Sequence, residues 1–332
     1  MRTPDPYLPC PFTRRTAMAA GLSSDQVKSR VATGRWRVLR RGVYCLRSTW
    51  ESATLEGRHV LEVDAALARA DGALWVSHAS AAVLYGLPLP RAGSPVYLTR
   101  PPPRGTSYLR GVHVEAATLP VADRTRRAGR PLTSLARTVA DCARHLPPAD
   151  GLAVADAALR SHPEVRHGAL SVLSACDTWP NAARARRVLR LVDGGRESPL
   201  ESWSCWYLHR LGLPAPSWQV NLFDAAGRWL ARVDAWWEEF AVAGEADGRV
   251  KYDVGPVEDL AAARQALYDE KRREDRLRAA GVGVVRWGAL DLRRPEEWGR
   301  RVREQLAAHD RAAFRGRSVP AYPDLLARQA GS

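Results

Sequence analysis

Three acidic residues and one lysine in the last third of the chain have the types and spacing of a metal-dependent hydrolytic site. Asp234 lies at the end of an apolar strand-like run, and Glu245, Asp247 and Lys251 follow on the next expected strand and the turn after it. Alternate residues of a strand share a face, so Glu245 and Asp247 should point the same way. Carboxylates of adjacent strands can bind Mg²⁺ or Mn²⁺, which prefer oxygen ligands. We therefore predict Asp234, Glu245 and Asp247 as metal ligands.

The metal and the lysine together would suit phosphodiester hydrolysis. A bound divalent cation polarises the phosphate and lowers the pKa of an attacking water, and Lys251 would orient that water or offset the developing charge. Lys251 stands out because three of the 50 basic residues are lysine, and arginine does not replace a compact ammonium group. We predict Asp234, Glu245, Lys251 and Glu201 as the catalytic residues of a Mg²⁺-dependent endonuclease.

Three of these four acids also have an ordinary structural explanation. Glu201 stands three residues after Ser198 and would complete a capping box at a helix start. Asp234 would serve as a turn residue at a strand end, and Asp247-Gly248 is a common turn dipeptide. Three hypotheses follow: an enzyme, a non-enzymatic protein with a vestigial site, and an interaction module that senses RNA or a partner protein.

The elements expected around these residues alternate between helices and strands. Residues 196–310 should form, in order, a helix from Ser198 to about Leu211, strands at Ser217–Phe223, Trp229–Trp237 and Phe240–Ala246, a charged helix at about 257–280, a strand at Val282–Trp287 and a helix near Pro295–His309. A three-strand meander followed by helix, strand and helix predicts an α/β domain with a mixed sheet. Asp234 and Glu245 would lie on neighbouring strands.

Several segments of this region carry motifs. GEADGRVKY has the form ExDGxxK, EKRREDRLRAAGVGVVRW follows it, and ESPLE and RVD precede it. Over about 95 residues this pattern resembles the very-short-patch-repair-like endonuclease family. The resemblance implies a restriction-endonuclease-like PD-(D/E)xK fold, with Asp234, Glu245 and Glu201 as metal or catalytic acids. Asp247 stands where the usual pattern has lysine, and Lys251 where many relatives have histidine.

The first 48 residues carry more than half of the positive charge, with ten basic and two acidic side chains. Such an excess favours a nucleic-acid partner. A helix at Thr13–Ala20, a second helix opened by a capping box between Ser23 and Gln26, and a hairpin at Arg35–Arg47 predict a winged helix-turn-helix. The residues expected to bind DNA are Lys28 and Arg30 on the second helix and Arg35, Arg37, Arg40 and Arg41 on the hairpin.

The same segment carries a family pattern. The run TRRTAMAAGLSSDQVKSRVATGRWRVLRRGVY is similar to the forms AxxAGLS and GRWxRLxRGVY, and SHASAAVLYGL further on has the form SHxSAAxLxGL. These runs resemble the type IV abortive-infection antitoxin family. The resemblance implies a DNA-binding winged helix, often autoregulatory, and raises a toxin protein as a possible partner. A non-enzymatic transcriptional regulator with a vestigial nuclease fold is therefore the alternative function.

Residues 49–195 are expected to form a mostly helical connector or regulatory domain. Helices are predicted near 59–70, 77–87, 134–145, 150–160, 167–175 and 181–192, with a hairpin at Val96–Val114 and a flexible hinge at Asp193–Arg196. The sequence thus predicts a multidomain α+β protein. Its parts are a winged helix (1–48), a helical domain (49–195), a nuclease-like domain (196–310) and a basic tail (311–332).

Composition narrows the remaining classes. The 332 residues have a net charge of +14, and the five cysteines lack metal-ligand spacing. Neither a signal-peptide stretch nor an apolar run of about 18 residues is present, so no membrane association is expected. We expect a cytoplasmic DNA-binding protein, acting in phage defence or DNA repair if it is hydrolytic. Nothing in the sequence indicates its oligomeric state.

Overall fold

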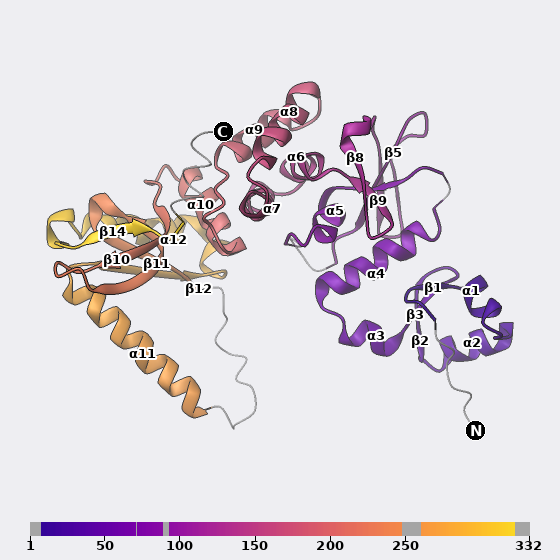
Figure 1. Ribbon diagram of the computed structural model, residues 1–332, viewed down its shortest axis with the longest axis horizontal. Helices are drawn as coiled ribbons and strands as arrows, with labels where there is room; N and C mark the ends of the chain where they lie inside the picture. The colour runs from indigo at the N-terminus through magenta and orange to yellow at the C-terminus, as the bar shows by residue number, and fades with distance from the viewer. Residues whose placement is uncertain (1–7, 71, 89–92, 248–259, 323–332) are drawn as a thin grey trace. The chain divides into compact units, whose positions relative to one another are not determined.

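The computed structural model describes residues 8–70, 72–88, 93–247 and 260–322 of the chain (Figure 1). The chain divides into two compact units, residues 1–142 and 143–332, and each is described by itself. Helices and three separate sheets confirm the coarse prediction of a chain of several parts that mixes helix and strand. None of the helices in the described ranges is both long and apolar enough to span a bilayer.

The N-terminal part of the first unit is a pair of short helices with a small sheet. α1 (Arg14–Ala19) and α2 (Ser24–Ala32) precede the hairpin of β2 (Trp36–Arg40) and β3 (Val43–Leu46), and β1 (Phe12–Thr13) pairs with β3. The expected capping box is confirmed, since Ser23 N donates to Gln26 Oε1 (2.8 Å) and Gln26 N donates to Ser23 Oγ (3.2 Å). Phe12, Val27 and Trp36 are buried in one core, which holds the hairpin against the helices.

A six-stranded sheet fills the rest of the first unit and makes the prediction of a mostly helical middle domain wrong for this part. The helices of this part are α3 (Arg47–Ser52), α4 (Leu55–Leu67) and α5 (His78–Leu84). Its strands are β4 (Trp75–Val76), which precedes α5, and then β5 (Val96–Arg100), β6 (Ser107–Leu109), β7 (Val112–Ala116), β8 (Arg124–Arg127) and β9 (Arg130–Thr133). Their order in the sheet is β6-β7-β5-β4-β9-β8. Strands this short carry too little alternation to be recognised.

The hairpin predicted at Val96–Val114 is also wrong. β5 pairs in parallel with β7, and the antiparallel partner of β7 is β6. The Pro-rich segment after β5 therefore leads into an extra strand rather than a simple turn. Because β6 is antiparallel to β7, the chain reverses its direction between these two strands.

The helices predicted between 134 and 192 are present. α6 (Leu135–His145) runs across the division between the units, and α7 (Pro148–Ser161), α8 (Val165–Ala175) and α9 (Ala182–Arg190) follow in the second unit. Their ends lie within about two residues of the expected positions. The helical part of the middle prediction is therefore confirmed for this half.

The flexible hinge predicted at Asp193–Arg196 is wrong. Arg196 is 2% exposed and donates to both carboxylate oxygens of Asp156 on α7, at 2.6 and 2.8 Å. Asp193 N also donates to Asp156 Oδ1, at 2.8 Å. A buried ion pair thus crosses the boundary expected at 195/196, and the independence of 196–310 as a domain stays a prediction.

The sheet of the second unit has the predicted order of elements and one more strand. β10 (Ser217–Phe223), β11 (Trp229–Trp237) and β12 (Val242–Asp247) form an antiparallel meander, α11 (Leu260–Ala279) follows, and β13 (Gly283–Gly288) pairs in parallel with β12. The mixed sheet is therefore confirmed. β14 (Arg317–Pro320) adds to β10, so the prediction of a tail from 311 is wrong for this segment.

Helices cover both faces of this sheet (Figure 1). On one face, called the tryptophan face, α10 (Pro199–Arg210) and α12 (Pro295–Ala307) pack with Trp237, Trp287 and Trp298. On the other, called the α11 face, Leu277 of α11 packs with Val233. The acidic residues predicted to do chemistry lie on β11, β12 and α10, between these two cores.

Candidate active site

Two of the predicted catalytic acids lie around one buried glutamine of the second unit. Gln219 of β10 donates its amide nitrogen to Glu201 Oε2 at 3.0 Å and to Asp234 Oδ1 at 3.1 Å. Its side-chain oxygen accepts from Arg232 Nε at 2.7 Å. Glu201 and Gln219 are each 3% exposed. A single neutral amide therefore joins two carboxylates in a nearly dry network.

The backbone of β10 and β11 brings these side chains together. Residues two apart in a regular strand share a face, but Trp218 packs on the tryptophan face and Val220 on the α11 face. The neighbours of Asp234 on β11 are divided in the same way, since Val233 packs on the α11 face and Ala235 on the tryptophan face. The regular alternation of side chains between the two faces is therefore interrupted in both strands, at the facing positions 219 and 234. Gln219 has a φ of 54°, a left-handed value that a non-glycine residue keeps only where its surroundings compensate.

Asp234 is also fixed to the neighbouring strand. Its Oδ2 accepts from Ala246 N at 2.8 Å, just beyond the point where the pairing of these two strands ends, at Ala235 and Gly244. The carboxylate thus takes over a backbone donor of β12. Gly244 is required here because a Cβ would meet the Trp287 ring at 2.6 Å.

Glu245 has one paired oxygen and one without a partner. Its Oε2 lies 3.0 Å from Arg273 Nη2 of α11, and Arg273 Nη1 donates to Arg232 O at 3.1 Å. Glu245 Oε1 is buried and has no hydrogen-bond partner in the part of the chain that the structure describes. A buried acceptor left without a partner is destabilising, so this oxygen is suited to receive a proton or a cation.

Burial raises the pKa of all three acids. The pKa of Glu245 rises to about 7, because burial disfavours the charged carboxylate and outweighs the attraction to Arg273, while Asp234 adds negative charge. Burial likewise raises the pKa of Asp234 and of Glu201, against hydrogen bonds that stabilise their charged forms. Shifted carboxylates of this kind are typical of functional sites, although structural networks produce them too.

The donor set fits a divalent cation in kind but is not a ready-made cluster of three acids. Among the described residues, Glu201, Asp234 and Glu245 do not have ligand atoms all within 4.8 Å of one another. Asp247 ends β12 two residues after Glu245 and lies on its face of the strand. Mg²⁺ needs one or two carboxylates and keeps several waters, so Asp234 and Glu245 would suffice. Lys251 lies outside the described residues.

Glu201 is only partly explained by helix capping. Ser198 Oγ accepts from Glu201 N at 3.3 Å, as an N-cap should. The Glu201 carboxylate, however, accepts from Glu197 N (3.0 Å), Ser198 Oγ (2.7 Å) and the Gln219 amide, and not from Ser198 N as in the predicted capping box. Its third bond links the helix to the acids on the sheet.

Three of the six residues predicted to bind DNA are exposed in the first unit, namely Lys28, Arg37 and Arg41. Lys28 forms an exposed ion pair with Asp25 at 3.1 Å, and the Arg37 guanidinium lies over the ring of Trp50, 4.2 Å from its centroid. Arg35 is partly exposed. These four side chains remain compatible with phosphate contact.

Arg30 and Arg40 have contacts within the protein that the prediction of six DNA-binding residues did not foresee. Arg30 is 5% exposed and lies over Trp36, 5.7 Å from the ring centroid, because its stem fills the core beneath the hairpin. Arg40 donates to Arg110 O at 3.0 Å and pairs with Glu62 at 3.2 Å. Both are engaged in contacts that stabilise the first unit.

Two important residues of the site were not predicted from the sequence. Gln219 interrupts the apolar run of β10, and a polar residue flanked by Trp218 and Val220 is the signal that could have identified it. Arg273 lies within the charge run of α11, where many neighbouring arginines carry the same signal. The sequence offered no means of distinguishing it.

Comparison with known proteins gives relatives without a described activity. No family model matches the chain. Two proteins from two strains of Mycobacterium tuberculosis, both described as uncharacterized, are each 31% identical to it over 192 residues, which is 58% of this chain. The chain spans 66% of the length of these relatives.

Proposed function

We propose that this protein is a DNA-binding, Mg²⁺- or Mn²⁺-dependent endonuclease, with a winged helix in residues 1–48 and a restriction-endonuclease-like domain in residues 196–310. The observation that carries the proposal is the buried network of Glu201, Gln219 and Asp234 beside Glu245, which has an oxygen without a partner among the described residues. The sequence resemblance to very-short-patch-repair-like endonucleases supports it, because the same acids match the family's motif.

In this proposal Asp234 and Glu245 hold the metal ion, with Asp247 as a third ligand. A bound Mg²⁺ would polarise a phosphodiester and lower the pKa of an attacking water. Gln219 and Ala246 N each donate to one oxygen of Asp234, and this keeps its carboxylate in one orientation. Preorganised ligands of this kind avoid the cost of ordering them during the reaction.

Two cations would act on the phosphate. Arg273 lies beside Glu245 and would offset the negative charge of an approaching phosphodiester. Lys251 is assigned to orienting the water, on the sequence motif. In the proposal Glu201 positions Asp234 through their shared partner Gln219. Glu201 is also a candidate for direct catalysis.

The decisive experiment compares the full-length protein with Asp234→Asn. Plasmid, linear duplex, single-stranded DNA and RNA are incubated with Mg²⁺, Mn²⁺ or a chelator. We expect metal-dependent cleavage by the wild type and a loss of about 100-fold or more for Asp234→Asn, with DNA affinity unchanged. Glu239→Gln, at an exposed acid of the same unit, is the matched control. Cleavage that survives Asp234→Asn places the chemistry elsewhere.

A non-enzymatic regulator is the second candidate, and one observation favours it. Arg273 already neutralises one oxygen of Glu245, and the acids are not grouped for immediate metal binding. In that case the nuclease-like fold is vestigial, and the winged helix binds a promoter, with a toxin as partner. Promoter binding by a wild type that is inert on all four substrates supports this candidate and refutes the first.

Both candidates act on DNA, and we place the protein in the cytoplasm. The five cysteines are all free thiols in the structure, as a reducing compartment favours. The neighbouring reading frames are the simplest place to look for a toxin. A toxin-like frame directly beside this one would favour the regulator.

A further inference from the structure

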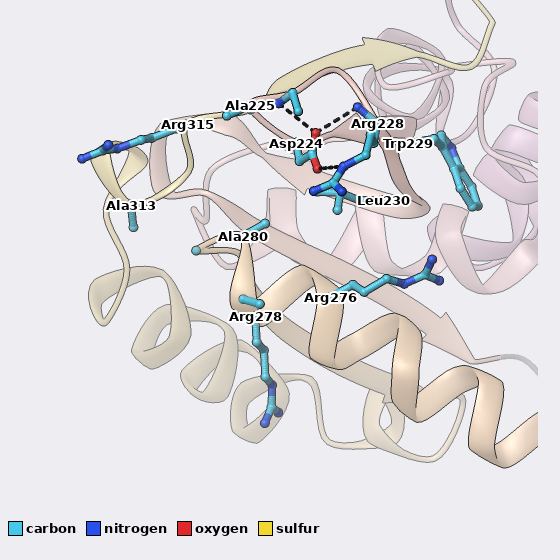
Figure 2. A pocket seen from close by; sticks show the side chains of 14 residues that line it. Asp224, Ala225, Arg228, Trp229, Leu230, Arg276, Arg278, Ala280, Ala313 and Arg315 are labelled. Carbon is cyan, nitrogen blue, oxygen red and sulfur yellow. Dashed lines mark hydrogen bonds and ion pairs between the residues drawn. The ribbon is translucent and has the colours of Figure 1, made fainter.

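An arginine-lined pocket opens between the β10–β11 turn, the end of α11 and the segment before β14 (Figure 2). Its volume is about 870 Å³, and its lining includes Arg228, Arg276, Arg278 and Arg315. Asp224 is the one acid among the described lining residues, and Arg228 pairs with it at 2.8 Å. The other three arginines therefore leave the pocket with a positive lining.

The arginines stand around this pocket and do not converge on one point. In Figure 2 Arg315 extends on one side of the opening, Arg276 on the opposite side and Arg278 away from both. A single phosphate is held by side chains that converge on it. Separated cations suit a polyanion whose charges are themselves spaced along a chain, such as a nucleic-acid strand.

Two exposed aromatic rings lie on segments that also carry exposed arginines. Trp229 lines the pocket and is 53% exposed, and its Nε1 donates to Asn221 Oδ1 at 3.2 Å, which restrains the ring. Tyr268 of α11 is 58% exposed, and the Arg272 guanidinium lies 5.8 Å from its ring centroid. Exposed rings beside arginines are the platforms on which unpaired bases stack.

α11 extends this surface along its length. Arg264, Tyr268, Arg272 and Arg276 are spaced four residues apart and all are exposed, so they follow one another on successive turns. We call the set the arginine–aromatic surface; it consists of Arg264, Tyr268, Arg272, Arg276, Arg315 and Trp229.

The arginine–aromatic surface lies within reach of the candidate acids. Arg276 follows Arg273, the partner of Glu245, by one helical turn, about 4.5 Å along the axis. On β11, Trp229 precedes Asp234 by five residues, roughly 16 Å of strand.

We propose that the arginine–aromatic surface binds single-stranded DNA and feeds the strand toward Asp234 and Glu245. The choice of DNA rests on the proposed function, whereas the need for unpaired bases rests on the exposed rings of Trp229 and Tyr268. Stacked bases in a duplex offer no face to such rings. The substrate of the second unit is therefore an unpaired or locally opened strand.

The charge part is tested by the binding of a labelled oligodeoxynucleotide to the full-length protein in a chelator, across salt concentrations. Arg264, Arg272 and Arg276 are replaced together by Gln. The control replaces Arg187, Arg190 and Arg303, three exposed helical arginines of the same unit, so both variants lose three charges. We expect about tenfold weaker binding and a salt slope smaller by about 2 for the first variant, and less than twofold change for the control.

The stacking part is tested by Trp229→Ala and Tyr268→Ala, each expected to weaken binding about tenfold, with Trp229→Phe close to wild type. Because the chelator removes any metal, absence of cleavage does not affect this test. Equal losses in the two triple variants, unchanged affinity in both alanine variants, or strong binding of single-stranded RNA with none of DNA would each overturn the proposal.

Discussion

Arg273 and Glu245 form an ion pair that joins α11 to the strand of the candidate acids. Arg273 Nη2 lies 3.0 Å from Glu245 Oε2, while Glu245 Oε1 has no hydrogen-bond partner in the described part of the chain. Burial raises the pKa of this carboxyl to about 7 in spite of the arginine. Glu245 therefore exchanges its proton near neutral pH, and the strength of the ion pair changes with pH.

We predict that the contribution of Glu245 to the free energy of unfolding decreases as pH rises from about 5 to 7. In the unfolded chain a glutamate loses its proton near the ordinary pKa of 4.5, whereas folded Glu245 holds it up to about 7. Between these values the folded state binds more protons, and stability then falls with rising pH. The contribution of Glu245 is at most about 3 kcal/mol. Asp234 and Glu201 act in the same direction.

Urea unfolding at several pH values measures this effect. Glu245→Gln mimics the protonated side chain and should remove the decrease in stability that Glu245 causes between about pH 5 and 7. Glu297→Gln, at an exposed glutamate of α12, should leave the slope as in the wild type. Parallel curves for wild type and Glu245→Gln would show that this carboxyl does not titrate as described.

We predict that Mg²⁺ stabilises the protein at pH 8 and much less at pH 5. A metal ion binds the deprotonated acids, so it competes with the proton on Glu245 and Asp234. At a metal concentration about 100 times the dissociation constant, the free energy of unfolding should rise by about 2.7 kcal/mol. The measurement is urea unfolding with and without Mg²⁺, and Asp234→Asn is the variant in which the gain should vanish. An equal gain in that variant would point to another metal site.

We predict that Gln219→Met lowers the free energy of unfolding by about 2–3 kcal/mol at pH 8. Methionine has a similar shape but leaves Glu201 and Asp234 without their shared donor. The loss should be smaller at pH 5, where a protonated carboxyl can itself donate. Gln265→Met, the same change at an exposed position of α11, is the control. A loss independent of pH would assign Gln219 a packing role alone.

The sequence predicted the elements of the second unit well because their patterns are local. The meander of β10, β11 and β12 has long apolar strands, and Ser198 marks a helix start by its own chemistry. The six-stranded sheet was missed because its strands are short and pair with distant partners. The supposed hinge at Asp193–Arg196 was misjudged because a Gly-rich segment looks mobile, while the Asp156 that fixes Arg196 lies 40 residues away.

Of the residues in the candidate site, only the acids could be predicted from the sequence. Asp234 and Glu245 stand out as carboxylates within apolar strands, but the bridging role of Gln219 depends on a change of phase in two strands that no local pattern shows. Arg273 differs from the arginines around it by its ion pair with Glu245, and Arg30 differs from its neighbours by its burial. Tertiary packing decides which members of a charge run are structural.

We predict that DNA binding by the first unit depends on the exposed basic residues and not on all six that the sequence suggested. Replacing Lys28, Arg37 and Arg41 by Gln should weaken duplex binding about tenfold and reduce the salt slope by about 3, with the melting temperature unchanged. Electrophoretic or anisotropy titrations at several salt concentrations measure both quantities. The control replaces Arg104, Arg126 and Arg127, three exposed arginines elsewhere in the unit.

Arg30 and Arg40, which are held in contacts within the protein, should respond in the opposite way. Arg30→Gln removes a side chain packed over Trp36, and Arg40→Gln leaves Glu62 without its partner, so each should lower the melting temperature by several degrees. The remaining folded protein should bind duplex DNA as the wild type does, because both guanidinium groups are held in contacts within the protein. If Arg30→Gln and Arg40→Gln instead weaken binding without loss of stability, these side chains leave their internal contacts when DNA binds, and the exposed set alone does not define the interface.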